Sequence, residues 1–306
     1  MQYLKLIRFP NLVIIALLQY LIKFSLIIPF GFEVVLTNFE FGLLVLSTVL
    51  IAAGGYAIND YFDVQVDKIN NSDEVIVGKT VKRRVAMAMH LCLSGIGVVI
   101  GFYLGYKAGN VNFGLIHVIA SGLLWFYSTN YKKQFLTGNL VVSFLTALVV
   151  IMIPIFEITP SITLANAQIS KNVFLLIGIY AVFAFITTLI REIIKDLEDY
   201  KGDVSMGYKT LAISWGPQKA KSLLNILGWL TLVSIALLLL VQFGVDYYAF
   251  TYVLLFIEIP LLMLLVKLPK AENALQYHKL SNLMKIIMIF GCLSMFVFTI
   301  LAQYGL

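Results

Sequence analysis

Charged side chains are scarce in this sequence of 306 residues, in which Asp, Glu, Lys and Arg together make up 12%. Soluble domains carry about 25% charged residues, so a chain with half that share cannot cover the surface of a water-soluble globule. Only two cysteines are present, which excludes a scaffold held by several disulfides. Hydrophobic residues make up 60%, which excludes intrinsic disorder. The remaining class is a protein that crosses a membrane several times.

Long apolar stretches recur along the whole chain. A bilayer core needs roughly 20 apolar residues per helix. Nine stretches come close to this length, approximately residues 9–30, 40–58, 85–106, 112–129, 137–157, 172–190, 221–243, 247–266 and 283–303. Continuous apolar runs exclude an outer-membrane barrel, because the strands of a barrel alternate in polarity. We therefore predict an all-α polytopic membrane protein with nine transmembrane helices, which forms one domain over residues 1–306 within a lipid bilayer.

The basic residues are distributed unevenly between the two sides of this predicted topology. With the N-terminus inside, the inside segments hold 19 Lys and Arg, whereas the opposite loops hold two, Lys107 and Lys171. Because loops rich in Lys and Arg face the cytoplasm, we predict a cytoplasmic N-terminus in a prokaryotic inner membrane. The net charge of +6 has the same origin, so no nucleic-acid partner is expected.

Ten of the 16 acidic residues fall in two short segments, and each segment follows a long apolar stretch. Each contains three aspartates with the spacing D-x-x-D-x-x-x-D. They are Asp60, Asp63 and Asp67 in the first segment, and Asp196, Asp199 and Asp203 in the second. On a helix, positions i, i+3 and i+7 share one face, and clustered charge near a membrane is costly. We therefore expect a positive partner to neutralise each cluster.

The chemistry of carboxylates points to a hard divalent cation, above all Mg²⁺. Mg²⁺ binds a small number of carboxylates and leaves its other positions to water and substrate phosphate oxygens, so two facing clusters would hold a diphosphate between them. Arg191 and Lys195 lie among the carboxylates of the second segment, and Lys132 lies between the fourth and fifth apolar stretches. These cations fit an anionic substrate. A solvated helix end would explain one cluster, but two clusters with identical spacing favour a metal and diphosphate site.

The two aspartate motifs, with Asn59 directly before the first, resemble those of the UbiA superfamily of intramembrane prenyltransferases. The resemblance covers nearly the whole chain, because shorter similar elements are spread along it. These elements are Arg8-Phe9-Pro10-Asn11, Tyr127-Ser128-Thr129-Asn130-Tyr131-Lys132, Gly138-Asn139 and Lys209-Thr210-Leu211.

The resemblance implies a helical bundle around a central cavity, and an enzyme that transfers a prenyl group from an isoprenyl diphosphate to a lipophilic acceptor with Mg²⁺ as cofactor. The six aspartates are then the expected catalytic residues, and the expected metal ligands among them are Asp60, Asp63, Asp196 and Asp199. The expected substrate-binding residues are Asn11, Asn59, Lys79, Tyr131, Lys132, Arg191 and Lys195. The active site is expected to face the cytoplasm, and no obligate protein partner is evident.

The stretch from Arg191 to Asp203 most resembles the digeranylgeranylglyceryl phosphate synthase branch, which transfers a geranylgeranyl group to geranylgeranylglyceryl phosphate. After the first motif the family usually carries an Arg-Pro pair, whereas this chain has Asp73-Glu74-Val75, so Lys79 is expected to supply the charge. An aromatic acceptor of quinone, tocopherol, chlorophyll or haem type is the alternative within the superfamily. A membrane transporter with an acidic site is the alternative outside it.

Overall fold

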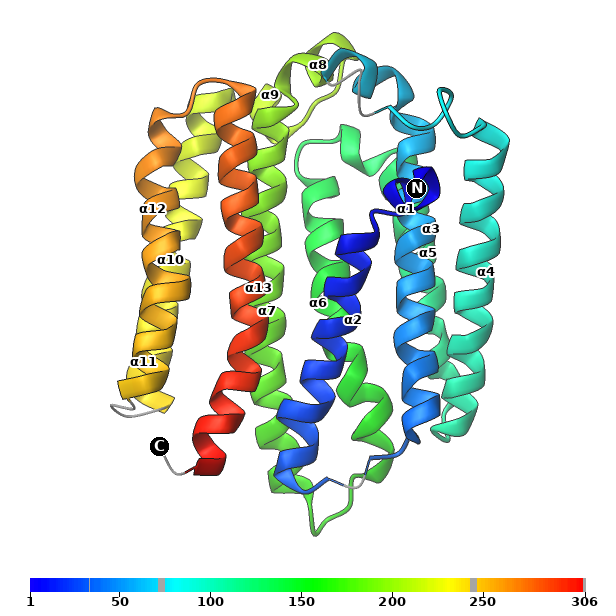
Figure 1. Ribbon diagram of the computed structural model, residues 1–306, viewed down its shortest axis with the longest axis vertical. Helices are drawn as coiled ribbons and strands as arrows, with labels where there is room; N and C mark the ends of the chain where they lie inside the picture. The colour runs from blue at the N-terminus through cyan, green and yellow to red at the C-terminus, as the bar shows by residue number, and fades with distance from the viewer. Residues whose placement is uncertain (33, 71–74, 243–246, 305–306) are drawn as a thin grey trace. The chain divides into compact units, whose positions relative to one another are not determined.

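The computed structural model describes residues 1–32, 34–70, 75–242 and 247–304, and within these ranges the only β-type pairing is an isolated bridge between Val77 and Val81. The helices are α1 Gln2–Leu6, α2 Phe9–Leu21, η1 Ile22–Ile27, η2 Ile28–Phe30, α3 Asn38–Asn70, α4 Arg83–Lys107, η3 Val111–Gly114, α5 Leu115–Thr129, η4 Tyr131–Lys133, α6 Thr137–Glu157, η5 Thr159–Ser161, α7 Ala167–Glu198, α8 Tyr200–Ser205, α9 Leu211–Ser214, α10 Pro217–Gln242, α11 Tyr247–Val253, η6 Leu254–Glu258, α12 Ile259–Lys267, η7 Leu268–Lys270 and α13 Ala274–Tyr304 (Figure 1). The prediction of an all-α protein is confirmed.

Nine helical segments of the described chain are long and apolar enough to cross a membrane. They are Phe9–Phe30, Asn38–Asn70, Arg83–Lys107, Val111–Thr129, Thr137–Ser161, Ala167–Glu198, Pro217–Leu240, Tyr247–Lys270 and Ala274–Leu301. Each contains most of one predicted stretch, which confirms the nine predicted helices. Two of them, α3 and α7, continue well beyond their apolar stretches, and these extensions carry most of the acidic residues of the two segments.

The chain divides into two compact units. The first comprises Met1–Lys132 and Ala147–Ala181, and the second comprises Lys133–Thr146 and Val182–Leu306. In the first unit, α3 packs along α4 and also contacts α2 and α5 (Figure 1). In the second unit, α13 packs against α11 and α12, and α10 packs against α12. The single domain and its central cavity stay predictions.

Glycines let the helices of the first unit approach closely. A Cβ atom on Gly54 of α3 would lie 2.7 Å from Ser94 Oγ and 3.2 Å from the backbone oxygen of His90, both on α4. A Cβ atom on Gly101 of α4 would lie 2.4 Å from the ring of His117 on α5. Close backbone approach provides the van der Waals contact that holds membrane helices together. The helix that carries the first aspartate motif is thus fixed against its neighbours.

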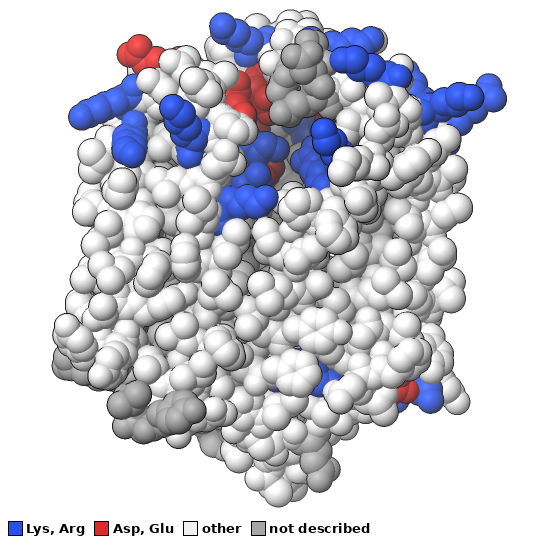
Figure 2. All heavy atoms as spheres, viewed as in Figure 1, with Lys and Arg blue, Asp and Glu red and all other residues white. Residues whose placement is uncertain are grey.

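On the face shown in Figure 2, Lys, Arg, Asp and Glu gather toward the ends of the helices.

Lys23, in the π-helix η1 of the first unit, forms a fully buried ion pair with Glu157, in which Nζ and Oε1 are 2.7 Å apart. Lys23 Nζ also donates to the backbone oxygen of Leu36, whose N–H donates to Glu157 Oε2. Because a buried charge is costly without partners, this pair ties the end of the first apolar span to the chain before α3 and to the end of α6.

Candidate active site

The first aspartate motif lies entirely on α3. Asp60, Asp63 and Asp67 therefore share one face of a continuous helix, as the spacing predicts. The side chains of Asp60 and Asp63 are each only 15% exposed. Carboxylates in such a setting need positive or hydrogen-bonding partners, and both aspartates receive them from other segments of the first unit.

Arg8 neutralises Asp60 from the residue directly before α2. Its Nη2 donates to Asp60 Oδ1 at 3.2 Å, and its guanidinium carbon lies 5.1 Å from the centroid of the Tyr56 ring. Asn11, on the first turn of α2, donates from Nδ2 to Tyr56 Oη at 3.4 Å. Burial acts to lower the pKa of Arg8, but the carboxylate of Asp60 together with Tyr56 and Tyr127 outweighs this effect and leaves the pKa above its usual value.

The backbone of Arg8 is strained, with φ 50° and ψ 54°. This left-handed region is uncommon for residues other than glycine, and Arg8 is the only non-glycine residue with positive φ in the described part of the chain. Such strain tends to occur at functional sites, where the surrounding structure enforces it. In this case it occurs at the residue that neutralises Asp60.

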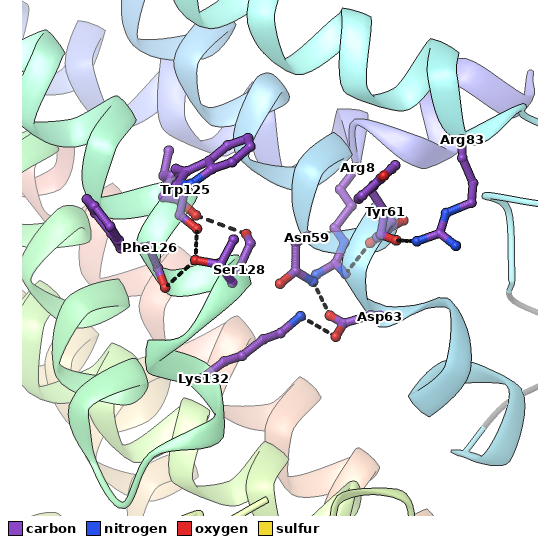
Figure 3. Close-up of polar contacts among 12 residues, drawn as sticks. Arg8, Asn59, Tyr61, Asp63, Arg83, Trp125, Phe126, Ser128 and Lys132 are labelled. Atoms are coloured by element: carbon purple, nitrogen blue, oxygen red, sulfur yellow. Dashed lines mark hydrogen bonds and ion pairs between the residues drawn. The ribbon is translucent and has the colours of Figure 1, made fainter. Parts of the chain in front are cut away.

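Asp63 accepts hydrogen bonds from two side chains (Figure 3). Lys132 in η4 donates from Nζ to Asp63 Oδ1, and Asn59, one turn earlier on α3, donates from Nδ2 to Asp63 Oδ2 at 2.7 Å. The Lys132 side chain is 8% exposed. Asn59 Oδ1 is buried and has no hydrogen-bond partner among the described residues. The first unit therefore presents an unsatisfied amide oxygen beside two paired carboxylates.

The second aspartate motif does not lie on one continuous helix, so the prediction of a shared helical face is wrong for it. Helix α7 ends at Glu198, Asp199 occupies the N-cap position of α8, and Asp203 lies within α8. Aspartate is a preferred N-cap residue, although Asp199 makes no side-chain cap hydrogen bond here. The break therefore separates Asp196 on α7 from Asp203 on α8.

Within the second unit, Asp196 on α7 accepts a hydrogen bond from Asn139 Nδ2 at 3.0 Å. Arg191, also on α7, donates from Nη1 to Glu192 Oε1 at 2.9 Å. The Nε atom of Arg191 is buried without a hydrogen-bond partner in the described residues. Lys195 follows Arg191 by four residues and so lies on the same side of α7. This segment combines carboxylates with a guanidinium that has an unused donor.

Two further residues of the predicted set lie in other surroundings. Tyr131 packs its ring against that of Phe126, with ring centroids 6.0 Å apart. Lys79 is exposed on a turn, where its backbone N–H donates to the oxygen of Ile76 at 3.3 Å. The positions Asp73 and Glu74, which replace the family's Arg-Pro pair, lie outside the described residues.

Two residues of the site are absent from the predicted set, Arg8 and Asn139. Both belong to the short sequence elements on which the resemblance rests, and these elements were the signal in the sequence that could have identified them as site residues. Their aspartate partners could not be inferred from the sequence, because Arg8 is 52 residues from Asp60 and Asn139 is 57 residues from Asp196.

Among the described residues, no group of three or more His, Cys, Asp or Glu side chains is arranged to hold a metal ion. The donor set of the first unit nevertheless fits a hard cation, because carboxylates and a buried amide oxygen are the ligand types that Mg²⁺ takes. Arg8 and Lys132 supply the counter-charge in the present arrangement. A cation at this place would therefore have to share the carboxylates with these side chains or replace them.

These features define a polytopic helical membrane protein with aspartate motifs at the ends of membrane-length helices. The sequence profile of the UbiA prenyltransferase family matches residues 14–302. The chain therefore belongs to the UbiA prenyltransferase family. The predicted membership of this superfamily is confirmed.

Curated relatives in this family are named digeranylgeranylglyceryl phosphate synthases. The protein of Saccharolobus solfataricus is 35% identical over 240 residues, which cover 78% of this chain and 79% of that protein. The protein of Methanothermobacter thermautotrophicus is 36% identical over 181 residues, which cover 58% of each chain. The match to the latter relative thus spans little more than half of its length.

Solved structures show the same fold. A structure of digeranylgeranylglyceryl phosphate synthase in membranes superposes with a TM-score of 0.66 at 23% identity, and the match covers 98% of both chains. A UbiA homolog from Archaeoglobus fulgidus bound to DMAPP and Mg²⁺ has a TM-score of 0.56 at 18% identity, with 97% of this chain and 100% of that chain covered. At these identities the likeness supports the helical architecture.

Proposed function

We propose that this protein transfers a prenyl group from an isoprenyl diphosphate to a lipophilic acceptor. The observation that carries the proposal is the first aspartate motif, where Lys132 and Arg8 lie against Asp63 and Asp60 beside the unsatisfied oxygen of Asn59. A diphosphate needs cations and metal-binding oxygens at one place, and its long tail needs apolar surroundings. Membership of the UbiA prenyltransferase family supports the reaction class.

We propose geranylgeranyl diphosphate as the donor and geranylgeranylglyceryl phosphate as the acceptor. The relatives support this choice, because proteins named digeranylgeranylglyceryl phosphate synthase include one that is 35% identical over 78% of this chain. The stretch from Arg191 to Asp203 supports the same branch. Lys132 and Arg191 provide cations in separate units of the chain, which suits a reaction whose two substrates both carry phosphate.

Mg²⁺ is the proposed cofactor, and the UbiA homolog bound to DMAPP and Mg²⁺ supports it. Asp60, Asp63 and the Asn59 oxygen are the proposed ligands in the first unit, and Asp196 and Asp199 are the proposed ligands in the second. When bound, Mg²⁺ supplies positive charge to the diphosphate as this group leaves.

The chain's own residues account for the rest of the proposed mechanism. Arg8 and Lys132 neutralise the first motif before substrate arrives, and Lys132 then turns from Asp63 to the entering diphosphate. In the second unit, the guanidinium of Arg191 would add fixed charge to a phosphate group through its unused Nε donor. The apolar helices exclude water, which would otherwise quench the allylic carbocation left by the departing diphosphate. The acceptor hydroxyl then attacks this carbon, and its proton passes to the released diphosphate.

We further propose that the ends of α3 and α7 that carry the motifs face the cytoplasm of a prokaryotic cell. The support is the split of 19 basic residues on that side against two on the other.

An acceptor panel tests the proposed reaction. The purified protein in lipid nanodiscs is incubated with Mg²⁺ and radiolabelled geranyl, farnesyl or geranylgeranyl diphosphate. The acceptors are geranylgeranylglyceryl phosphate and an aromatic quinone precursor. We expect labelled digeranylgeranylglyceryl phosphate from the geranylgeranyl donor, and less by about 100-fold or more with the Asp63→Asn variant. Transfer to the aromatic acceptor alone would overturn the proposed acceptor, and no transfer from any donor would overturn the proposed reaction.

A further inference from the structure

We propose that the first unit carries a binding site for an anionic phospholipid of the surrounding bilayer, separate from the aspartate motif. A surface cavity of about 500 Å³ lies beside α3 and the start of α4. Its walls are formed by Tyr61, Arg83, Arg84, Met87, Ala88 and Leu91. Among the described residues, no carboxylate lines this cavity, so its described lining differs in charge from the aspartate site.

The cavity opens on a different side of α3 from the aspartates. Successive residues of a helix are turned by about 100°, so Tyr61 points away from the face shared by Asp60 and Asp63. In Figure 3, Arg83 reaches toward Tyr61, whereas Lys132 approaches Asp63 from the other side. A ligand in the cavity would therefore contact neither the aspartates nor Lys132.

Two guanidinium groups form the polar end of the cavity. The guanidinium carbon of Arg83 lies 4.6 Å from the centroid of the Tyr61 ring, and its Nη2 donates to the Tyr61 backbone oxygen at 3.4 Å. Both Arg83 and Arg84 are exposed, and neither forms an ion pair with any described residue. Arginine binds phosphate oxygens in a bidentate manner, so this pair suits a phosphate group.

The apolar wall of the cavity continues along α4 into the membrane span. Arg84, Ala88 and Leu91 are spaced i, i+4 and i+7 and so share one face of the helix. Leu91 is 60% exposed, and at 1.5 Å per residue it lies about 10 Å deeper along the helix than Arg84. Because α4 begins at Arg83 and is long enough to cross a membrane, its charged end lies at the interface and Leu91 lies among the lipid chains.

This arrangement of two cations at the interface above an apolar wall matches one occupant, a phospholipid with a negatively charged headgroup. Its phosphate would bind the two arginines, and one of its chains would lie along Met87 and Leu91. Tyrosine is common at the level of lipid headgroups, and basic pockets beside membrane helices bind anionic headgroups. A soluble anion would use the arginines but would leave the apolar wall uncovered.

Native mass spectrometry of the delipidated full-length protein tests the site. Phosphatidylglycerol and phosphatidylcholine with the same chains are titrated separately, and the retained lipid is counted. We expect the wild type to retain one phosphatidylglycerol with about tenfold preference over phosphatidylcholine. The double variant R83Q/R84Q should lose this preference, and R83K/R84K should keep part of it. The matched control K82Q should behave as wild type, since Lys82 precedes α4 and does not line the cavity.

Two outcomes would overturn the proposal. One is equal retention of phosphatidylglycerol by the wild type and R83Q/R84Q, provided that R83Q/R84Q unfolds at a temperature close to that of the wild type. The other concerns the wild type alone and applies even if R83Q/R84Q does not fold. Millimolar inorganic phosphate is added to the wild type with bound phosphatidylglycerol. Loss of the preference for phosphatidylglycerol would mean a soluble-anion site and would overturn the proposal, whereas an unchanged preference supports a lipid site.

Discussion

Individual aspartates of the first motif depend on cations that come from distant parts of the first unit. Arg8 reaches Asp60 from a strained backbone before α2, and Lys132 reaches Asp63 from the short helix after α5. The aspartates could be predicted from their spacing, because three carboxylates on one helical face are unusual. Their partners could not, since a contact over many residues depends on how the helices pack.

Replacement of Asp63 by asparagine should reduce prenyl transfer by about 100-fold or more, because it removes charge from the proposed metal and diphosphate site. Asp60→Asn should reduce prenyl transfer to a similar extent. Transfer of radiolabel to the acceptor measures the effect. Glu272→Gln, at an exposed carboxylate outside both motifs, is the control and should keep wild-type activity. Wild-type activity in either aspartate variant would contradict the proposed role of the first motif.

Substitution of two adjacent lysines distinguishes the effect of a specific contact from the effect of general positive charge. Lys132 is bound to Asp63, whereas Lys133 is exposed and lies over the ring of Tyr208 in the second unit. Lys132→Met should raise the KM for the prenyl diphosphate by about tenfold or more, because a nearly buried phosphate contact is lost. Lys133→Met should change it little. Equal effects of the two substitutions in steady-state kinetics would argue against a direct role of Lys132.

At the scale of helices, the apolar stretches predicted the nine membrane-length elements of the described residues, because a bilayer-spanning helix has a strong length and composition signal. The sequence also placed the first motif correctly on one helix. It failed at Asp199, which lies between the end of α7 at Glu198 and the start of α8 at Tyr200. The spacing of the second motif therefore did not predict the break in the helix.

The buried pair of Lys23 and Glu157 joins three elements of the first unit and should contribute strongly to its stability. Lys23→Met alone should destabilise the protein by about 3–5 kcal/mol, because it leaves Glu157 buried without its partner. The double variant Lys23→Met/Glu157→Met should lose less than the two single variants combined. Thermal unfolding in detergent measures these changes.

The control for that experiment is the more exposed pair of Lys107 and Glu40, with Nζ and Oε1 3.6 Å apart. Lys107→Met should cost about 1 kcal/mol or less. If Lys23→Met proves as mild as Lys107→Met, the buried pair does not hold these elements together.

For the whole molecule, the distribution of basic residues predicts the orientation of the chain in the membrane. In a variant without Cys92 and Cys292, a cysteine at the exposed position Lys209 should resist an impermeant thiol reagent added to intact cells. A cysteine at the exposed position Lys171 should react. Labelling of position 209 but not of position 171 would mean that the proposed orientation is reversed.

The central claim is that the aspartate motifs bind a prenyl diphosphate through a divalent cation. Without Mg²⁺, Arg8 and Lys132 are occupied in neutralising the carboxylates of the first motif, and a bound Mg²⁺ adds the positive charge that attracts a diphosphate. Calorimetry of geranylgeranyl diphosphate binding to the protein in nanodiscs, with Mg²⁺ or with EDTA, measures this directly. We predict affinity about tenfold or more higher with Mg²⁺, and no such gain in Asp60→Asn/Asp63→Asn. Equal affinity with Mg²⁺ and with EDTA would contradict the account.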